Sequence, residues 1–258
     1  MSKAAKIMQC ENKYAECFCK PTEQQGFIRF RDEMIPDMYY HNYTRITGAK
    51  ADAELVQIIE TEIAHSKAEG KDFCLIRCHV PVNDTALARL PYTPDVSMAG
   101  HYLLEIANMP ELKGVSECSV RRVDKHEMLE DILRLDLEHD GESLGKDFCT
   151  RRIYRRKDVY LSDEGVDSYI CYAGGEAVGN CDLFIFGDTA KIEDFSVSPR
   201  HQRKGYGTAI LKALIETAVQ CGVTAVYLEA DEDATAKEMY VKCGFYIIHE
   251  FTDLLFMM

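Results

Sequence analysis

The chain lacks an excess of positive charge, and this shortage excludes one broad class of function. Its 258 residues contain 30 lysines and arginines against 43 aspartates and glutamates, which gives a formal net charge of -13. Such a field repels a polyanion, so general binding of nucleic acid through phosphate contacts is excluded. A local basic site for one small anion is still compatible with this charge balance.

Long apolar runs and paired cysteine motifs are also missing. No run approaches the roughly 18 apolar residues of a membrane-spanning helix, and the first residues, MSKAAKIMQCENK, lack the apolar core of a signal peptide. The eleven cysteines include no C-x-x-C pair and no zinc-finger spacing. We therefore expect a cytoplasmic protein with reduced thiols, no metal, and no membrane or nucleic-acid partner.

Strand-like and helix-like segments alternate along the chain, which predicts an α/β protein with a mixed sheet. In the first half, strands are expected at 27–32 and 73–80, and a helical apolar stripe covers 52–70. In the second half we expect strands at 118–124, 168–173, 177–186, 190–197 and 224–230, and helices at 125–139, 208–222 and 234–244. Residues 245–258 favour one or two strands.

Prolines predict where the chain divides. Four of the seven lie between residues 81 and 110, a spacing that favours a loop-rich connection and a domain boundary near 110–117. We expect an N-terminal arm over 1–21, an accessory α/β domain over 22–115 and a second domain over 116–258.

The openings of the two halves are faintly similar. RFRDEM at 29–34 and RVDKHEM at 122–128 are each followed by helix-like sequence. A tandem repeat of one fold therefore stays open as an alternative for the first half, although this similarity alone does not establish it.

The stretch VSPRHQRKGYGTAILKALIE at 197–216 is suited to the small-anion site that the net charge leaves open. Gly205 and Gly207 allow a tight turn and a close approach of a ligand just ahead of a helix. The first N–H groups of a helix have no partner within it and carry the positive end of its dipole, which favours an anion. Arg203 and Lys204 add positive charge. A P-loop and a G-x-G-x-x-G fingerprint are both absent.

The segment from Gln202 to Gly207, QRKGYG, resembles the [QR]-x-x-G-x-[GA] motif of the GNAT superfamily of acetyl-CoA-dependent N-acyltransferases. Its setting is similar to that family as well, because LEA at 228–230 and AKEMYVKCGF at 236–245 follow the helix. The resemblance covers about residues 117–258. It implies a GNAT fold for the C-terminal half, preceded by a smaller α/β domain that is either accessory or a degenerate GNAT-like repeat.

The resemblance also implies acetyl-CoA as co-substrate, with the motif amides holding its pyrophosphate. The backbone of Phe195 and Val197 would pair with the pantetheine arm like an added strand, and the Val197 N–H would hold the thioester oxygen. Asp233 stands where the family often has an asparagine that contacts this arm, and a carboxylate can still accept a hydrogen bond or cap the helix. The residues implied for the cofactor are Phe195, Val197, Gln202, Arg203, Lys204, Gly205, Tyr206, Gly207, Thr208 and Asp233.

Two residues are implied for catalysis. Tyr240 takes the position of the family's acid, which protonates the departing thiolate. EDFSV at 193–197 resembles the E-D-F-x-V of polyamine acetyltransferases, where the glutamate is the proposed base, so we favour Glu193 as base. In a regular strand Glu193 and Asp194 point to opposite faces, so at most one reaches the acceptor. A core tyrosine and a solvated strand carboxylate are the structural alternatives.

The predicted activity is transfer of the acetyl group to an amine by direct attack. An ammonium group has no lone pair, so a base must first remove a proton, directly or through water. The acceptor is a small amine or a lysine or N-terminal amine, and the acidic balance favours a cationic one. A non-catalytic acyl-CoA-binding sensor is the alternative function, and a homodimer is left open.

A second basic cluster lies outside the motif. Its members, which follow one another closely over seven residues, are Arg151, Arg152, Arg155, Arg156 and Lys157. We expect a solvated helix face, with recognition of an acidic acceptor or of the CoA 3′-phosphate as alternatives.

Overall fold

The computed structural model describes residues 1–49, 51–162, 165–231 and 236–258, with only the backbone of Ala236. Contacts divide these residues into two compact units. The larger unit contains Met1–Cys17, His101–Glu229 and 236–248; the smaller unit contains Phe18–Gly100, 230–231 and His249–Met258. Strands β5 (Asp95–Glu105) and β11 (Tyr246–Met257) contribute residues to both units, so the chain passes from one unit to the other within strands.

The sheet of the larger unit has the hydrogen-bonded order β5-β10-β9-β8-β7-β6. Its strands, apart from β5, are β6 (Cys118–Arg122), β7 (Asp167–Ala173), β8 (Glu176–Phe186), β9 (Thr189–Val197) and β10 (Ala225–Asp231). Neighbours from β6 to β9 are antiparallel, whereas β9 and β10 are parallel. A parallel pair needs a crossover connection, and α6 (Tyr206–Gln220) supplies it.

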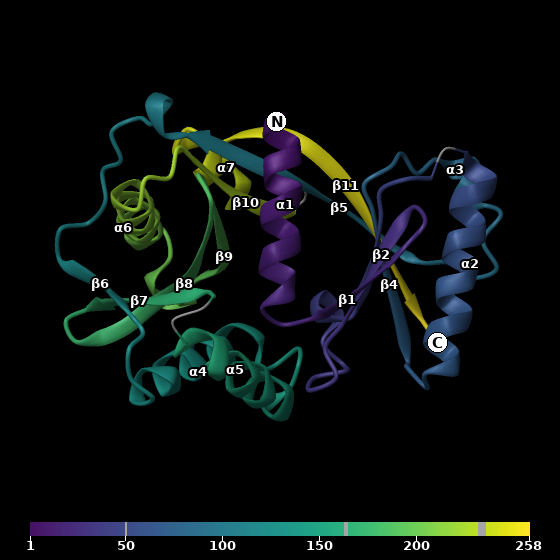
Figure 1. Ribbon diagram of the computed structural model, residues 1–258. Helices are drawn as coiled ribbons and strands as arrows, with labels where there is room; N and C mark the ends of the chain where they lie inside the picture. The colour runs from purple at the N-terminus through teal and green to yellow at the C-terminus, as the bar shows by residue number, and fades with distance from the viewer. Residues whose placement is uncertain (50, 163–164, 232–235) are drawn as a thin grey trace. The chain divides into compact units, whose positions relative to one another are not determined.

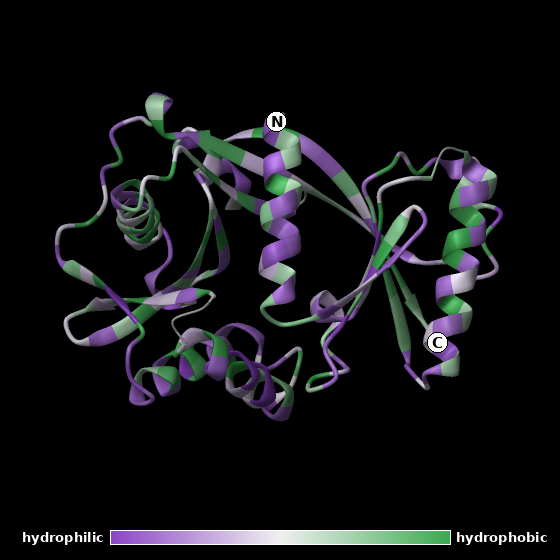
Figure 2. Cartoon of the chain, viewed as in Figure 1, coloured by the Kyte–Doolittle hydropathy of each residue, from purple (hydrophilic) through white to green (hydrophobic). Residues whose placement is uncertain are grey.

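Helices lie on both sides of this sheet. Figure 1 shows α6 on one side of β7–β9 and the pair α4 (Glu127–Asp140) and α5 (Lys146–Tyr160) on the other. The face of α6 that contacts the strands is fully apolar, and its buried residues are Ala209, Ile210, Leu211, Leu214, Ile215 and Ala218. Figure 2 shows that α5 is much more hydrophilic than α6. The remaining elements are α7 (Ala236–Lys242) and two 3-10 turns, η2 (Ile106–Asn108) and η3 (Pro199–His201).

The N-terminus differs from the expected loose arm. Residues Lys3–Glu16 form helix α1, which Ser2 caps by accepting a hydrogen bond from the Ala5 N–H at 3.2 Å. This helix belongs to the larger unit, where it contacts β8 and β9. Its buried residues, Ile7, Cys10, Glu11 and Ala15, repeat at helical spacing, but a cysteine and a glutamate take two of the four positions. The buried face of α1 could therefore not be recognised in the sequence as an apolar helical stripe.

The smaller unit has the strand order β1-β2-β3-β4-β11. Its elements are β1 (Lys20–Gln24), β2 (Phe27–Arg31), η1 (Tyr39–His41), β3 (Tyr43–Ile46), α2 (Asp52–Ala68), β4 (Phe73–Cys78) and α3 (Asp84–Leu87). The pairs β1–β2 and β2–β3 are antiparallel, β3–β4 is parallel with α2 as crossover, and β4–β11 is antiparallel. Its core packs α2 against β4 and β11 through residues such as Ile59, Ile76 and Leu254.

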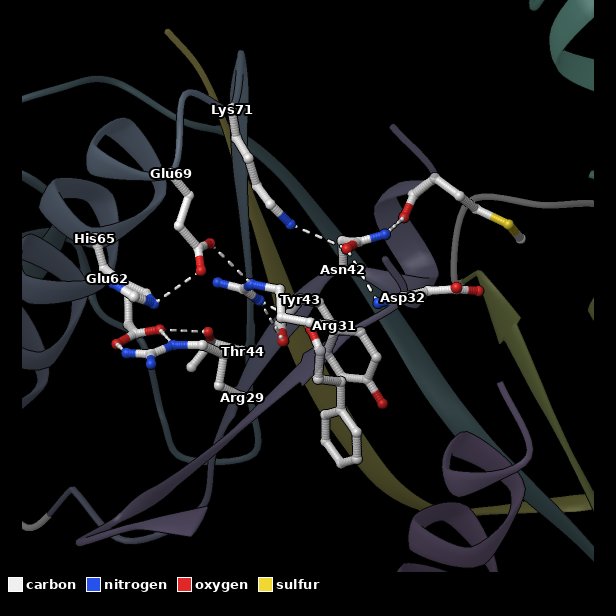
Figure 3. Close-up of polar contacts among 12 residues, drawn as sticks. Arg29, Arg31, Asp32, Asn42, Tyr43, Thr44, Glu62, His65, Glu69 and Lys71 are labelled. Carbon is white, nitrogen blue, oxygen red and sulfur yellow. Dashed lines mark hydrogen bonds and ion pairs between the residues drawn. The ribbon is translucent and has the colours of Figure 1, made fainter. Parts of the chain in front are cut away.

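A polar network in the smaller unit joins α2 to the sheet (Figure 3). The Glu62 side chain is fully buried and accepts two hydrogen bonds from Arg29 on β2, at 2.8 and 2.5 Å, and one from Thr44 on β3, at 2.7 Å. Burial raises the pKa of Glu62, but Arg29 and Thr44 outweigh it and lower the pKa below its usual value. Glu62 is thus a structural carboxylate that fixes α2 on the sheet.

The predicted mixed α/β class is confirmed, and the predicted segments from 27–32 to 245–258 form strands and helices close to the expected bounds. The predicted boundaries at 22 and 116 differ from the two units, because α1, residues 101–115 and residues 249–258 each pack with the other half of the chain. Strand β5 also falls in the region expected to be loop. Among the described residues, no helix combines the length and apolarity that crossing a membrane requires.

Replacing Arg29 with methionine should destabilise the chain, because it leaves a buried Glu62 carboxylate without its cationic partner. We expect a loss of about 3 kcal/mol in the free energy of unfolding at pH 7, measured by urea denaturation. The loss should shrink as the pH falls through the acidic range, where Glu62 is protonated in both states. Lys20→Gln, an exposed change on β1, is the control and should cost under about 0.5 kcal/mol; an equal loss in both variants would contradict this account.

Candidate active site

The pairing of β9 with β10 ends before either strand does. In the described residues their parallel register runs from Thr189 opposite Ala225 to Ile192 opposite Leu228, although β9 continues to Val197. Residues 193–197 therefore form an edge of backbone whose partner on that side has diverged. Such an edge can pair with an extended ligand that carries amide groups.

A β-bulge re-aims this edge. Opposite β8, Glu193 pairs with Asp182 and Ser196 pairs with Asn180, so β9 holds one residue more than β8 over this interval. Asp194 adopts φ 51°, a left-handed conformation that is uncommon outside glycine. The bulge breaks strict alternation, so the argument that placed the Glu193 and Asp194 side chains on opposite faces does not hold.

The orientation of Val197 follows from the register after the bulge. Val197 lies opposite Gly179, and the next residue, Ser198, donates its N–H to the Val178 carbonyl at 2.9 Å. In an antiparallel ladder this makes Val197 and Gly179 a non-hydrogen-bonded pair. The N–H and C=O of Val197 are consequently directed away from β8, and its C=O accepts a hydrogen bond from Gln202 Nε2 at 3.1 Å. By the same alternation the backbone of Phe195 faces that edge.

Helix α5 stabilises the bulge through an ion pair with the side chain of Asp194. The Arg156 guanidinium is buried and pairs with the Asp194 carboxylate, while Asn180 donates to the Asp194 carbonyl at 3.0 Å. Burial would raise the pKa of Asp194, but Arg156 outweighs it and lowers the pKa. The neighbouring Asp182, fully buried, has its pKa raised to about 8 by burial and by the Asp194 charge.

The basic cluster on α5 is therefore not the solvated face that we expected. Arg156 is buried against Asp194, and Arg152 pairs with Asp136 and Asp140 of α4 at 2.5 and 2.6 Å. Arg151 fits the expectation, since it is exposed and pairs at 2.8 Å with the exposed Asp147, one turn earlier on the same helix. Two of the five basic residues thus brace the fold, and sequence alone could not separate them from the others.

The turn after β9 has the backbone that a glycine-rich anion site requires. Gly205 adopts φ 88° and immediately precedes α6, and Arg203 also has a positive φ, 62°. A Cβ on Gly205 would lie 2.9 Å from Val115 Cγ2, and one on Gly207 would lie 3.1 Å from the Met239 sulfur. The first free N–H groups of α6 belong to this turn, and the side chains of Arg203 and Lys204 are exposed beside them. Tyr206 and Thr208, in the first turn of α6, are partly buried.

Tyr240 lies close to the edge of β9. Its ring centroid is 6.2 Å from that of Phe195, and the side chain is buried. Burial raises the pKa of the phenol well above its usual value, and the nearby Cys181 and Glu193 raise it further, so the hydroxyl stays protonated at neutral pH. Asp233, the remaining residue implied for the cofactor, lies outside the described residues.

Glu193 belongs to a buried charged cluster. Lys191 Nζ lies 2.8 Å from the Glu193 carboxylate and 2.7 Å from that of Glu11 on α1. Burial raises the pKa of Glu193, Lys191 opposes that shift, and the charge of Glu229 on β10 supports it. The Glu229 carboxylate in turn lies 3.1 Å from His101 Nε2, within hydrogen-bonding distance. A carboxyl group with a raised pKa next to an unpaired strand edge is suited to accepting a proton.

Three members of this cluster, Glu11, His101 and Glu229, place ligand-type atoms within 4.8 Å of one another. The Lys191 ammonium already supplies positive charge at this point, which weakens the case for a metal ion there. Sequence reasoning missed Glu11 and Lys191. Lys191 is two residues before Glu193 and so shares its strand face, which was a usable signal, whereas Glu11 is distant in the chain.

Residues 127–245 match the model of the acetyltransferase (GNAT) family. The C-terminal region of the chain, residues 127–245, is therefore a GNAT acetyltransferase domain, and this match supports an acyltransferase of the GNAT N-acetyltransferase type. This favours the enzyme over the binding-only sensor that the sequence left open. The matched residues contain β9, α6, β10 and α7, which carry the candidate site.

Relatives extend over most of the chain. It is 23% identical to "Uncharacterized N-acetyltransferase CgeE" of Bacillus subtilis strain 168, over 91% of each protein. A conserved protein of unknown function from Staphylococcus epidermidis has a similar structure, with a TM-score of 0.76, 17% identity, and 91% and 92% of the two chains covered. So does a GCN5-related N-acetyltransferase from Kribbella flavida, with a TM-score of 0.74, 14% identity, and 98% and 95% covered.

One further structure, described as a tandem GNAT protein from the clavulanic acid biosynthesis pathway, has a TM-score of 0.57 and 13% identity, with 90% and 78% covered. At these identities the structures establish the fold: a GNAT acyltransferase fold in the C-terminal half, preceded by a smaller α/β part.

Gly205→Ala should destabilise the larger unit, because a Cβ there combines a positive φ with contact at 2.9 Å to Val115. We expect a loss of about 2 kcal/mol in the free energy of unfolding. Gly174→Ala is the matched control, since Gly174 has φ 59° but nothing within 4 Å of the added Cβ, and should cost about 1 kcal/mol. Equal losses in urea denaturation would show that the Val115 contact relaxes freely.

Proposed function

We propose that the protein moves the acetyl group of acetyl-CoA to an amine by direct attack, with Glu193 as base, directly or through water, and Tyr240 as acid. The observation that carries the proposal is the unpaired edge of β9 at 193–197, followed at once by a glycine-opened helix start. An extended, amide-containing arm that ends in a pyrophosphate needs these two features in this order. The acetyltransferase match of residues 127–245 supports the same ligand.

The residues around the edge fit acetyl-CoA. Backbone groups of Phe195 and Val197 that face away from β8 would pair with the pantetheine arm. The free N–H groups at the start of α6, together with the exposed charges of Arg203 and Lys204, would hold the pyrophosphate. Gln202 has a separate role, since it closes the turn through the Val197 carbonyl.

In the proposed reaction the acceptor ammonium gives a proton to Glu193, and the amine nitrogen then forms a bond to the thioester carbon. The Val197 N–H would stabilise the oxyanion that develops. The C–S bond then breaks, the CoA thiolate takes the proton of Tyr240, and the second proton lost by the nitrogen returns to the Tyr240 phenolate, directly or through water, which leaves a neutral amide. The raised pKa of Glu193 makes its carboxylate a stronger base, and the raised pKa of Tyr240 keeps on its hydroxyl the proton that the thiolate takes.

The charge of the protein supports a cationic acceptor. The net charge of -13 attracts a cation over long range. We also place the protein in the cytoplasm, because all eleven cysteines are free thiols and such thiols persist in a reducing compartment.

Tyr240→Phe and Glu193→Gln test the two roles. Each should lower kcat by about 100-fold or more, because each removes a proton transfer group, while the Kd for CoA changes little. Thiol release from acetyl-CoA over a panel of amines gives kcat, and calorimetry gives the Kd. Unchanged turnover in either variant would remove that residue from its role. A folded native chain that binds CoA but releases no thiol with any amine would leave acyl transfer to these acceptors without support.

We further propose that the smaller unit is a degenerate GNAT-like repeat. Its strands β1-β2-β3-β4 have the pairing antiparallel, antiparallel, parallel, with α2 as crossover, which is the pattern of β7-β8-β9-β10 with α6. A fold of this kind in tandem occurs in the protein named above for its tandem GNAT domains. Between β3 and α2, however, the sequence TGAKA at 47–51 has no Q-x-x-G-x-G pattern.

If the repeat has lost its phosphate turn, each chain should bind one CoA. Isothermal titration of the full chain with CoA should therefore give a stoichiometry near one. Substituting Gly205 with aspartate, which places a carboxylate at the anion site, should abolish this binding. A second binding event that survives Gly205→Asp would show that the smaller unit, too, binds the cofactor.

A further inference from the structure

Helix α1 lies outside the GNAT-matched residues 127–245, yet it places a side chain in the charged cluster around the candidate base. Glu11 on α1 is 4% exposed, and its carboxylate lies 2.7 Å from Lys191 Nζ. Lys191 is 3% exposed and lies 2.8 Å from the Glu193 carboxylate. One buried ammonium is therefore shared between a carboxylate of the catalytic strand and a carboxylate of the N-terminal helix.

We propose that Glu11 and Lys191 are positioning residues that together hold Glu193 in the state in which it can accept a proton. The inference rests on the proposed role of Glu193 as base. Lys191 favours the ionised form of the partly buried Glu193 carboxylate and so opposes the rise in its pKa that burial causes. Glu11 draws on the same ammonium and so prevents Lys191 from making Glu193 too weak a base.

The geometry of α1 is fixed by contacts other than this triad. Lys6 pairs with Asp188 at 2.5 Å, Lys3 pairs with Glu105 at 2.8 Å, and the Tyr14 ring packs edge-on against Phe184 with centroids 5.7 Å apart. Because these contacts lie along the helix on both sides of Glu11, changing Glu11 alone leaves α1 in place. The effect on Glu193 can then be measured without loss of the helix.

Charged and titratable groups reach Glu193 from each element packed around it. They are Glu11 and Tyr14 on α1, Lys191 on β9, Glu229 on β10, Cys181 on β8 and Tyr240 on α7. The charges that act most strongly on Glu193 are those of the Lys191 ammonium and of the Glu229 and Glu11 carboxylates. Removing the charge of Glu11 makes this surrounding charge less negative, and removing that of Lys191 makes it more negative.

These opposite signs give the proposal its test. With glutamate labelled by 13C at the side-chain carboxyl, the Glu193 signal of the full chain is identified by its loss in Glu193→Gln, and its titration is followed by NMR. In Glu11→Gln the midpoint should move to lower pH, and in Lys191→Met to higher pH. In the double variant the midpoint should lie between those of the native chain and Lys191→Met, because Lys191 contacts Glu193 directly and Glu11 lies beyond it. A purely structural role would not produce opposite shifts that offset each other in part.

The matched control is Glu16→Gln, an exposed carboxylate on the same helix that pairs with Lys13, and its midpoint should equal the native one. Midpoints that do not move, or that move in the same direction in both single variants, would overturn the proposal. If Lys191→Met does not fold, the comparison of Glu11→Gln with Glu16→Gln decides alone: a lower midpoint only in the first supports it, and equal midpoints overturn it.

Kinetics separate this inference from the proposed function. With an amine acceptor found in the panel, the acid limb of kcat/KM should move in Glu11→Gln in the same direction as the NMR midpoint. Activity at a fixed pH on that limb should change by about tenfold if the midpoint moves by a full pH unit. If Glu193→Gln keeps full turnover, Glu193 is not the base, whatever the midpoints do. If Glu193→Gln is inactive and the midpoints do not move, Glu193 remains the proposed base, whereas the positioning roles of Glu11 and Lys191 are rejected.

Discussion

The end of the β9–β10 ladder at Ile192 and Leu228 is the constraint on which the candidate site depends. Up to that point the two strands satisfy each other's backbone groups, and beyond it the groups of 193–197 on that side need another partner. The bulge at Asp194 then decides which groups face the edge. One additional residue in a strand reverses the direction of the N–H and C=O groups of the residues that follow it. Without the bulge, the Val197 N–H would point toward β8 and would form a hydrogen bond within the sheet.

Two buried cations, one on α5 and one on β9 itself, pair with the carboxylates of this strand. Arg156 serves Asp194 at the bulge, and Lys191 serves Glu193 and Glu11. Unpaired carboxylates would be costly in such surroundings, and their pKa values would rise until they became neutral. Asp182, which no cation contacts as closely, shows this outcome, since its pKa is raised to about 8. Asp194 differs from Asp182 in two ways, since it is paired with Arg156 and is only partly buried.

Sequence patterns predicted the features that depend on residues close together in the chain. The helix start at Gly205, the stripe of α6 and the strands β7 to β10 follow from glycine placement and periodicity, and the motif at 202–207 indicated the family. The bulge could not be predicted, because the residue that pairs with Asp194, Arg156, lies 38 residues earlier on a helix. Helix α1 was missed since Glu11 occupies its buried face, and a glutamate there makes sense only beside Lys191. Strand β5 was missed because prolines flank it.

The distribution of β11 over both units has a consequence for how the chain is made. Strand β4 obtains its antiparallel partner from residues 252–257, so the sheet of the smaller unit stays incomplete while the ribosome synthesises the 170 or so residues between them. During that time β4 presents an open, apolar edge, which is a hazard for aggregation. Folding of the smaller unit therefore has to wait for residues 252–257, and truncation before residue 252 should harm the smaller unit more than the larger one.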